Sequence, residues 1–130
     1  MTEKRPLYKI PHIGGPAIEG SLICGDEIEF AYNMPHHQVR GGFRFSKIRA
    51  SRTRSMLACA RWHVEGVIAT LVEVVDSDWV AELQRDTGER QRRSGQNWEM
   101  HHYMIFLENS GCSEVIAESW ELLPERIEPD

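Results

Sequence analysis

The sequence has little cysteine and no closely spaced cysteine pair. Its three cysteines, Cys24, Cys59 and Cys112, are far apart in the chain and odd in number. A disulfide framework needs paired cysteines in an oxidising compartment, and a structural zinc site usually contains close cysteine pairs. We therefore expect free, buried thiols in a cytoplasmic protein that has no metal site and no cofactor.

Long apolar segments are also absent. No run of about 18 apolar residues exists, so the sequence predicts no membrane-spanning helix. The first ten residues, MTEKRPLYKI, lack the apolar stretch of a secretory signal. Of the 130 residues 41% are hydrophobic and 27% are charged, a composition typical of one globular domain and not of a disordered chain.

Motifs of familiar catalytic or nucleotide-binding chemistry are missing. The chain has no P-loop, no glycine motif for dinucleotides, no zinc-protease motif, no calcium loop and no G-x-S-x-G serine. The adjacent His36 and His37 lie in a predicted loop and would need further ligands to hold a metal. His101 and His102 lie on a predicted strand and point to opposite faces, so they cannot bind one ion together. These absences favour a function without catalysis.

Acidic residues are missing between positions 33 and 64. This basic window has a net charge of +7, against −2 for residues 1–32 and −10 for residues 65–130, which together give −5. Two interpretations stay open. Neighbouring acidic strands can neutralise the basic window, or the window forms a cationic patch for a carboxylate, a phosphate or an acidic protein surface.

Nucleic acid is a less favoured partner for the basic window. The segment GGFRFSKIRASRTR combines aromatic and basic side chains, as nucleic-acid-binding surfaces often do. The chain as a whole is acidic, however, and the excess of negative charge in its second half would repel a polyanion. We therefore expect an acidic protein surface or a small anionic ligand as the partner.

The pattern of apolar residues predicts an α+β fold, mainly an antiparallel sheet with one or two short helices. Residues 1–20 contain three prolines and three glycines, which predicts an extended N-terminal arm packed on the domain. Residues 21–130 are predicted to form a single α+β domain.

Four segments between residues 27 and 75 are predicted as strands or loops. Clean alternation predicts a half-buried strand at 27–34, and the run VIATLVEVV predicts a buried strand at 67–75. Between them, 36–42 is predicted as a loop with the Gly41–Gly42 pair as its hinge, followed by an extended segment at 43–54.

Helical signals are weaker. The segment 55–65 fits either a helix or a continued strand. After an N-cap signal at Ser77, apolar residues at helical spacing predict a short helix over 77–86. The wholly polar stretch 86–97 is predicted as an exposed, mobile loop.

The C-terminal part predicts a β-hairpin between residues 98–107 and 114–122. A three-residue turn, Asn109-Ser110-Gly111, makes the numbers of opposed residues sum to 220. In this register His102 faces Glu118, and Met100 faces Trp120. The opposite face of the hairpin is predicted to be core, with Tyr103, Ile105, Leu107, Val115 and Ala117.

The amphiphilic face of this hairpin is the candidate site. His102 and Glu118 are weak candidates for a general base and its orienting carboxylate, or they form a cross-strand polar pair. Met100 and Trp120 would provide an apolar wall for a ligand. The candidate anion-binding residues come from the basic window: Arg44, Arg49, Arg52 and Arg54.

Two functions from different classes follow. The first, favoured because catalytic motifs are missing, is a non-catalytic interaction module, such as a regulator or an immunity-type protein, that selects its partner with a charged face. The alternative is a small ligand-binding protein or enzyme with an arginine and histidine anion site on the amphiphilic sheet face.

Overall fold

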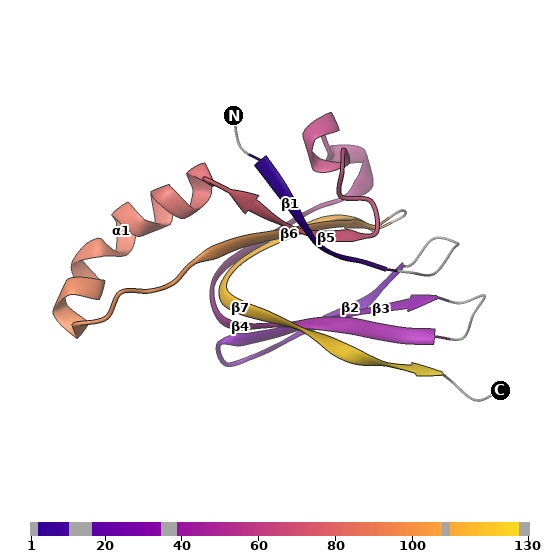
Figure 1. Ribbon diagram of the computed structural model, residues 1–130, viewed down its shortest axis with the longest axis horizontal. Helices are drawn as coiled ribbons and strands as arrows, with labels where there is room; N and C mark the ends of the chain where they lie inside the picture. Colours follow the sequence, from indigo (N-terminus) through magenta and orange to yellow (C-terminus); the bar gives the residue numbers. More distant parts are fainter. Residues whose placement is uncertain (1–2, 11–16, 35–38, 108–109, 128–130) are drawn as a thin grey trace.

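A computed structural model describes residues 3–10, 17–34, 39–107 and 110–127 of the chain. In these residues one antiparallel sheet is accompanied by one α-helix and two 3-10 turns (Figure 1). The predicted α+β class and the C-terminal hairpin are confirmed. No helix of the described part is both long and apolar enough to cross a membrane. The elements are β1 (Glu3–Lys9), β2 (Ala17–Cys24), β3 (Glu27–Met34), β4 (Val39–Arg54), η1 (Met56–Ala58), η2 (Arg61–His63), β5 (Thr70–Val75), α1 (Asp78–Ser94), β6 (His101–Leu107) and β7 (Gly111–Ile127).

The sheet is folded over on itself because its two longest strands bend. The strand order is β1-β5-β6-β7-β4-β3-β2, and Figure 1 shows β4 and β7 curving together from one half to the other. Lys47 adopts a positive φ of 54° at the bend of β4. The pairs Phe45–Trp120 and Ile48–Ala117 lie on either side of Lys47, and all four residues face the inside although regular alternation would separate them.

The main core fills the space between the two halves of the bent sheet. Phe43 is fully buried and makes an edge contact with Trp120, with ring centroids 6.2 Å apart. The sequence placed Trp120 on the amphiphilic face, and this is wrong because the bend reverses the alternation of β7 after Ala117. The predicted core face of the hairpin is confirmed. The buried members are Ile10, Ile28, Phe30, Tyr32, Phe43, Phe45, Leu71, Tyr103, Ile105, Leu107, Val115 and Ala117.

Gly41 and Gly42 belong to strand β4, so the predicted hinge is wrong. A Cβ atom on Gly41 would lie 2.5 Å from the hydroxyl oxygen of Tyr32, and one on Gly42 would lie 2.5 Å from the carbonyl oxygen of Phe30. The glycines allow strand β3 and its aromatic side chains to approach closely, a role that turn statistics do not reveal. Residues 36–38 of the predicted loop lie outside the described residues.

The helix predicted over 77–86 is too short, because α1 continues to Ser94. The exposed loop predicted over the polar stretch 86–97 is therefore wrong for most of its length. Ser77 caps its first turn by accepting the Val80 N–H at 3.2 Å, and Gly95 ends it in the left-handed conformation. Many of the residues between, the alanine, leucine, glutamates, glutamines and arginines, have good helix propensity, and Glu89 pairs with Arg93 at 2.7 Å. An exposed helix of this kind has no apolar stripe that periodicity would detect.

Segment 55–65 is neither a helix nor a strand but contains the two 3-10 turns, η1 and η2. These turns lie against one end of the outer face, which we define as the surface of β5, β6, β7 and β4 that points away from the main core. Cys59 and Val64 pack there on a second apolar cluster. Its buried members are Val67, Val72, Val74, Met104, Phe106 and Cys112.

The predicted N-terminal arm contains the two edge strands of the sheet. Residues 3–9 form edge strand β1, which pairs antiparallel with β5 and is irregular between Pro6 and Tyr8. Residues 17–24 form β2 at the other edge, and residues 11–16 lie outside the described part. The predicted strand 27–34 is confirmed, whereas β5 begins at Thr70 and not at residue 67.

The hairpin of β6 and β7 has a different register from the predicted one. Leu107 pairs with Gly111, so His102 is opposite Ile116 and not Glu118. Gly111 has a φ of 98° and begins β7 instead of closing the turn. A Cβ atom there would collide with the carbonyl of Arg54, which explains why the glycine is needed at this position. The shift is two residues, so the faces are kept while every partner changes.

Candidate functional site

Four polar side chains form a hydrogen-bonded row across the outer face of the sheet, at right angles to the strands. We call this row of side chains the polar chain. Arg52 comes from β4, Glu114 from β7, His102 from β6, and Ser77 from the turn between β5 and α1. Arg52 is directly opposite Glu114, while His102 is diagonal to it because its own partner is Ile116. Four segments that are far apart in the sequence therefore meet in one hydrogen-bonded chain.

The hydrogen bonds within the polar chain are short, and they connect all four side chains. Ser77 Oγ lies 2.7 Å from His102 Nδ1, and His102 Nε2 lies 2.8 Å from Glu114 Oε1. Arg52 donates to both carboxylate oxygens, from Nε at 2.8 Å and from Nη2 at 3.1 Å. Since Ser77 Oγ already accepts the Val80 N–H, its proton is directed to Nδ1, and the Nε2 proton of a neutral His102 is directed to Glu114.

The polar chain is buried except at Arg52. Ser77, His102 and Glu114 are 8%, 3% and 1% exposed, whereas the Arg52 side chain is 47% exposed. Burial alone would raise the pKa of Glu114, but the hydrogen bonds from His102 and Arg52 outweigh it and lower the pKa to about 2. Glu114 is therefore a carboxylate at neutral pH, and a buried charge in this setting marks a candidate functional site.

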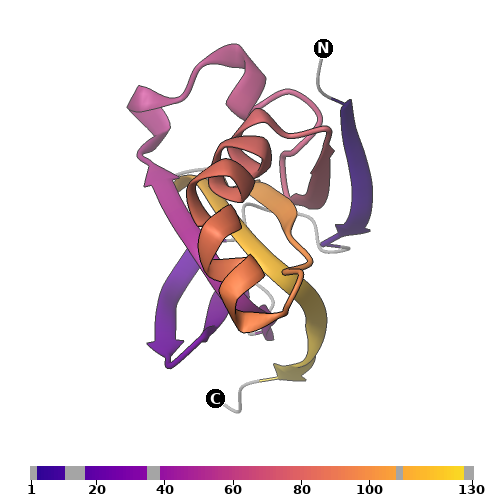
Figure 2. The ribbon, with the colours of Figure 1, turned by 90° about the vertical axis from the view of Figure 1, so that its left-hand side faces the viewer.

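Tryptophan side chains cover the polar chain. The Trp79 ring stands edge-on to His102 with centroids 5.1 Å apart, and the Arg52 guanidinium carbon lies 3.9 Å from the Trp79 ring centroid. Figure 2 shows α1, which carries Trp79, in front of the sheet on the side of the bend. A cavity of about 220 Å³ opens here, lined by Arg52, Trp62, Val74, Ser77, Asp78, Trp79 and His102.

A second cavity, of about 300 Å³, shares Ser77 and His102 with the first. The predicted wall residue Met100 lines it together with the first turn of α1. Ser77 and His102 therefore line two cavities, although little of their own surface is exposed. The cavity is lined by Glu73, Val74, Val75, Asp76, Ser77, Val80, Ala81, Met100, His101 and His102.

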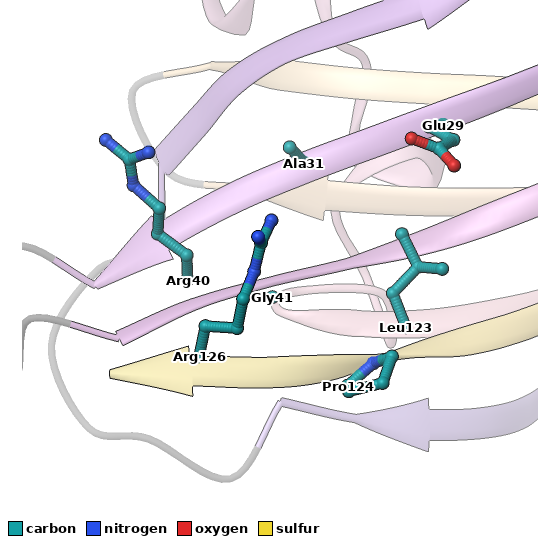
Figure 3. A pocket seen from close by; sticks show the side chains of 7 residues that line it. All are labelled: Glu29, Ala31, Arg40, Gly41, Leu123, Pro124 and Arg126. Atoms are coloured by element: carbon teal, nitrogen blue, oxygen red, sulfur yellow. The ribbon is translucent and has the colours of Figure 1, made fainter. Parts of the chain in front are cut away.

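Arg44 lies on the other half of the bent sheet, far along β4 from Arg52. It bonds Glu29 at 2.6 Å and Glu121 at 2.6 Å across its two neighbouring strands. A smaller pocket of about 120 Å³ is found on this half. Figure 3 shows that Glu29 and Leu123 lie towards one end of it, and the arginines Arg40 and Arg126 towards the other.

The other predicted site residues contact different partners. Arg49 stacks on Trp98, 4.1 Å from its ring centroid, and Arg54 donates to the carbonyl of Ala58 at 3.2 Å. Glu118 is 3.8 Å from Lys47 at the bend and is not the partner of His102. Of the predicted arginines, Arg52 is the one that the structure brings to His102.

The basic window is largely paired within the chain. Arg44 and Arg52 bond carboxylates as described, Lys47 pairs with Glu118, and Arg61 lies 3.4 Å from Glu65. These pairs favour the interpretation that acidic strands neutralise the window. A continuous cationic face therefore has less support than it had from the sequence.

Sequence reasoning missed Glu114, Trp62 and Trp79 as site residues and recognised Ser77 only as a helix cap. One signal for Glu114 was present: it is a carboxylate in an apolar run whose alternation places it on a buried face. Such a residue needs a partner inside the protein. The correct turn register would have placed His102 diagonally across from Glu114, within reach of its side chain.

The described residues contain no group of three or more histidine, cysteine, aspartate or glutamate side chains arranged to hold a metal ion. His36 and His37 lie outside the described part of the chain. Comparison with protein-family models, curated proteins and solved structures finds no match to this chain.

Proposed function

We propose that the protein binds a small organic acid, a carboxylate with a flat apolar body, in the cavity beside His102. The observation that carries this proposal is the convergence of Arg52, His102 and Ser77 on a cavity that has tryptophan walls. Pockets for small ligands combine apolar and aromatic walls with a few polar groups that fix the orientation of the ligand. This cavity has that composition.

Arg52 supports the choice of a carboxylate. Its Nε and Nη2 atoms bond Glu114, and Nη1 takes no part in these bonds. Because Glu114 and Trp79 hold the guanidinium in place, little conformational entropy is lost when a ligand binds to Nη1. Asp78 at the rim of the cavity disfavours ligands with several negative charges, which is why we propose a single carboxylate and not a phosphate.

The volume of the cavity limits the size of the ligand. About 220 Å³ is enough for a molecule of benzoate size in contact with Trp62 and Trp79, which both line the cavity. The two indoles provide most of the apolar contact, and the contact between Arg52 and the carboxylate sets the orientation.

The test is a binding measurement on the whole protein by NMR chemical-shift titration. We expect benzoate and phenylacetate to shift the indole N–H signals of Trp62 and Trp79, whereas benzyl alcohol, which has similar size and no charge, binds at least about ten times more weakly. Inorganic phosphate is expected to give no saturable shift.

Two arginine variants form a matched pair. Arg52→Gln removes the group that contacts the carboxylate, and we expect at least a tenfold weaker affinity for benzoate. Arg54→Gln removes an exposed arginine of the same strand that does not line the cavity, and we expect no change. Equal affinity of wild type and Arg52→Gln, or no binding of either acid to wild type, would reject the proposal.

A second candidate function, binding of an acidic protein surface, has support at η1 and η2. Leu57 is 94% exposed and Met56 is 45% exposed, and the basic residues Arg54 and Arg61 flank them in the sequence. Exposed pairs such as that of Arg61 with Glu65 contribute little stability, so an acidic partner can compete for the arginine. Exposed apolar side chains with basic neighbours are suited to binding an acidic protein surface.

Affinity capture from cells of the source organism tests this second function. Leu57→Ser should lose any specific protein that wild type retains at low salt. Leu122→Ser, which removes a 40% exposed leucine from β7, should retain that protein. Identical recovery by wild type and Leu57→Ser would remove the support for an interaction surface at η1.

A further inference from the structure

We propose that Ser77 is a nucleophile that accepts an acyl group from a small ester, with His102 as its general base. The proposal rests on the proposed function, since the acyl compound would enter the same cavity that binds the acid. The observation behind it is the relay Ser77–His102–Glu114, whose two hydrogen bonds are 2.7 Å and 2.8 Å long. A hydroxyl, an imidazole and a carboxylate in series are the parts of an activated serine.

The direction of the hydrogen bonds suits proton transfer. Val80 N–H occupies one lone pair of Ser77 Oγ, which leaves the hydroxyl proton directed to Nδ1 of His102 and a second lone pair for attack. On its other side, Nε2 donates to a Glu114 carboxylate that Arg52 keeps ionised. This carboxylate would stabilise the imidazolium that forms when His102 takes the serine proton.

Access to the serine also fits the proposal. Ser77 and His102 both line the cavity of about 220 Å³, so a carbonyl group placed there can reach Oγ. Ser77 is the N-cap of α1. Its Oγ accepts the Val80 N–H, so the N–H groups of Asp78 and Trp79 are the ones without an acceptor in the helix. In the proposed reaction these two are the donors available to the negative charge on the carbonyl oxygen.

The reaction balances as an ester hydrolysis. Ser77 Oγ attacks the carbonyl carbon while its proton passes to His102 Nδ1, and the alcohol leaves with that proton as the acyl-serine ester forms. A water molecule then attacks the acyl-serine, gives its proton to Nδ1 and displaces Ser77 Oγ, which regains the proton. The products are a carboxylic acid and an alcohol. The acid belongs to the ligand class of the proposed function.

The test uses a fluorophosphonate probe and p-nitrophenyl benzoate. We expect intact-mass analysis of the whole protein to show one adduct, mapped to Ser77 by peptide sequencing. Ser77→Asn keeps a side-chain oxygen as the helix cap but has no nucleophile, so it should form no adduct and lose at least about 100-fold in kcat/KM. Ser94→Ala, at the opposite end of α1, should react like wild type.

Glu114 is a positioning residue in this scheme, because it acts through His102. Glu114→Gln keeps an oxygen for the histidine but lacks the charge, so we expect kcat to fall about 100-fold while KM changes little. A purely structural role would lower the apparent kcat only in proportion to the folded fraction, which urea denaturation measures separately on the same variant.

Benzoate binding separates the two proposals. If wild type and Ser77→Asn bind benzoate while wild type forms no adduct at Ser77, the acyl-transfer proposal is rejected and the binding pocket stands. If wild type binds no acid and forms no adduct, both are rejected. An adduct on a different residue also overturns the assignment of Ser77.

Discussion

The imidazole of His102 and the carboxylate of Glu114 are hydrogen-bonded at 2.8 Å although the two residues are not paired across the hairpin. His102 is opposite Ile116, and Glu114 is opposite Met104, so the contact runs along the diagonal. Diagonal neighbours of antiparallel strands are within reach of long side chains. Because Glu114 also bonds Arg52, one carboxylate connects three adjacent strands.

Loss of the Glu114 charge should therefore destabilise the whole sheet. Glu114→Gln leaves Arg52 without its ion pair and gives His102 a weaker acceptor, and we expect the free energy of unfolding to fall by about 3 kcal/mol in urea denaturation. Glu118→Gln is the matched control, since this carboxylate is half-buried and lies 3.8 Å from an exposed Lys47. Its effect should stay below about 1 kcal/mol, and equal effects of the two variants would contradict this view.

The pH dependence of stability should identify the same carboxylate. The pKa of Glu114 is lowered from 4.5 to about 2, so its contribution is complete above about pH 4.5 and is lost as the pH falls towards 2. Wild type should lose more stability than Glu114→Gln between these two values in urea titrations. Parallel curves for the two proteins would show that the pKa of Glu114 is the same in the folded and unfolded states.

The sequence predicted which face of the hairpin each side chain lies on better than it predicted which residues are opposite each other. Alternation correctly placed Tyr103 and Ile105 in the core and His102 on the opposite face. The partner of His102 was wrong because the turn was assumed to end at Gly111, and a shift of two residues preserves every face. Trp120 was misplaced for a different reason, since the bend at Lys47 is a tertiary feature that has no local signal.

The candidate site was only partly predictable for a similar reason. His102 and Arg52 were identified by residue type, but Ser77 and Trp79 approach them through the β5–α1 connection, whose position depends on the order of the strands. Strand order is set by long-range packing and not by the periodicity of one segment. Arg44 and Arg54 shared the charge pattern of Arg52, yet the bend of β4 and the length of the strand take them elsewhere.

His101 should make stability depend on pH in the opposite sense. Partial burial lowers the pKa of His101, but the hydrogen bonds to Glu73 and Glu99 outweigh it and raise the pKa above 6.5. Its contribution is therefore complete below about pH 6.5 and is lost as the pH rises through the higher folded value. Between about pH 6 and 8.5, wild type should lose up to about 1 kcal/mol more than His101→Gln. A stability difference that does not change with pH would contradict the assignment.

The glycines of β4 and α1 should respond in opposite directions to alanine. Gly42→Ala places a Cβ 2.5 Å from the Phe30 carbonyl oxygen, which belongs to a paired strand and cannot move away, so we expect a loss of about 2 kcal/mol or more. Gly88→Ala places its Cβ 3.4 Å from the flexible end of Arg92. Because alanine favours the helix, thermal unfolding should show a gain of about 0.5–1 kcal/mol. Destabilisation by both variants would mean that residue 88 is not in a regular exposed helix.

Gln91 should hold the far end of α1 to the segment that leads into β6. Its side chain is 6% exposed; Oε1 accepts the Trp98 N–H at 2.8 Å, and Nε2 donates to Thr87 at 2.9 Å. Gln91→Ala leaves the Trp98 amide without this acceptor, which we expect to accelerate its hydrogen exchange at least tenfold, corresponding to about 1.4 kcal/mol.

Two controls accompany this prediction. Gln96 is an exposed neighbour whose side chain makes none of these bonds, so Gln96→Ala should leave the exchange rate of the Trp98 amide unchanged. Because the amides of β6 depend on sheet pairing and not on Gln91, their exchange should also stay the same. Faster exchange throughout β6 would show instead that α1 and the sheet unfold as one unit.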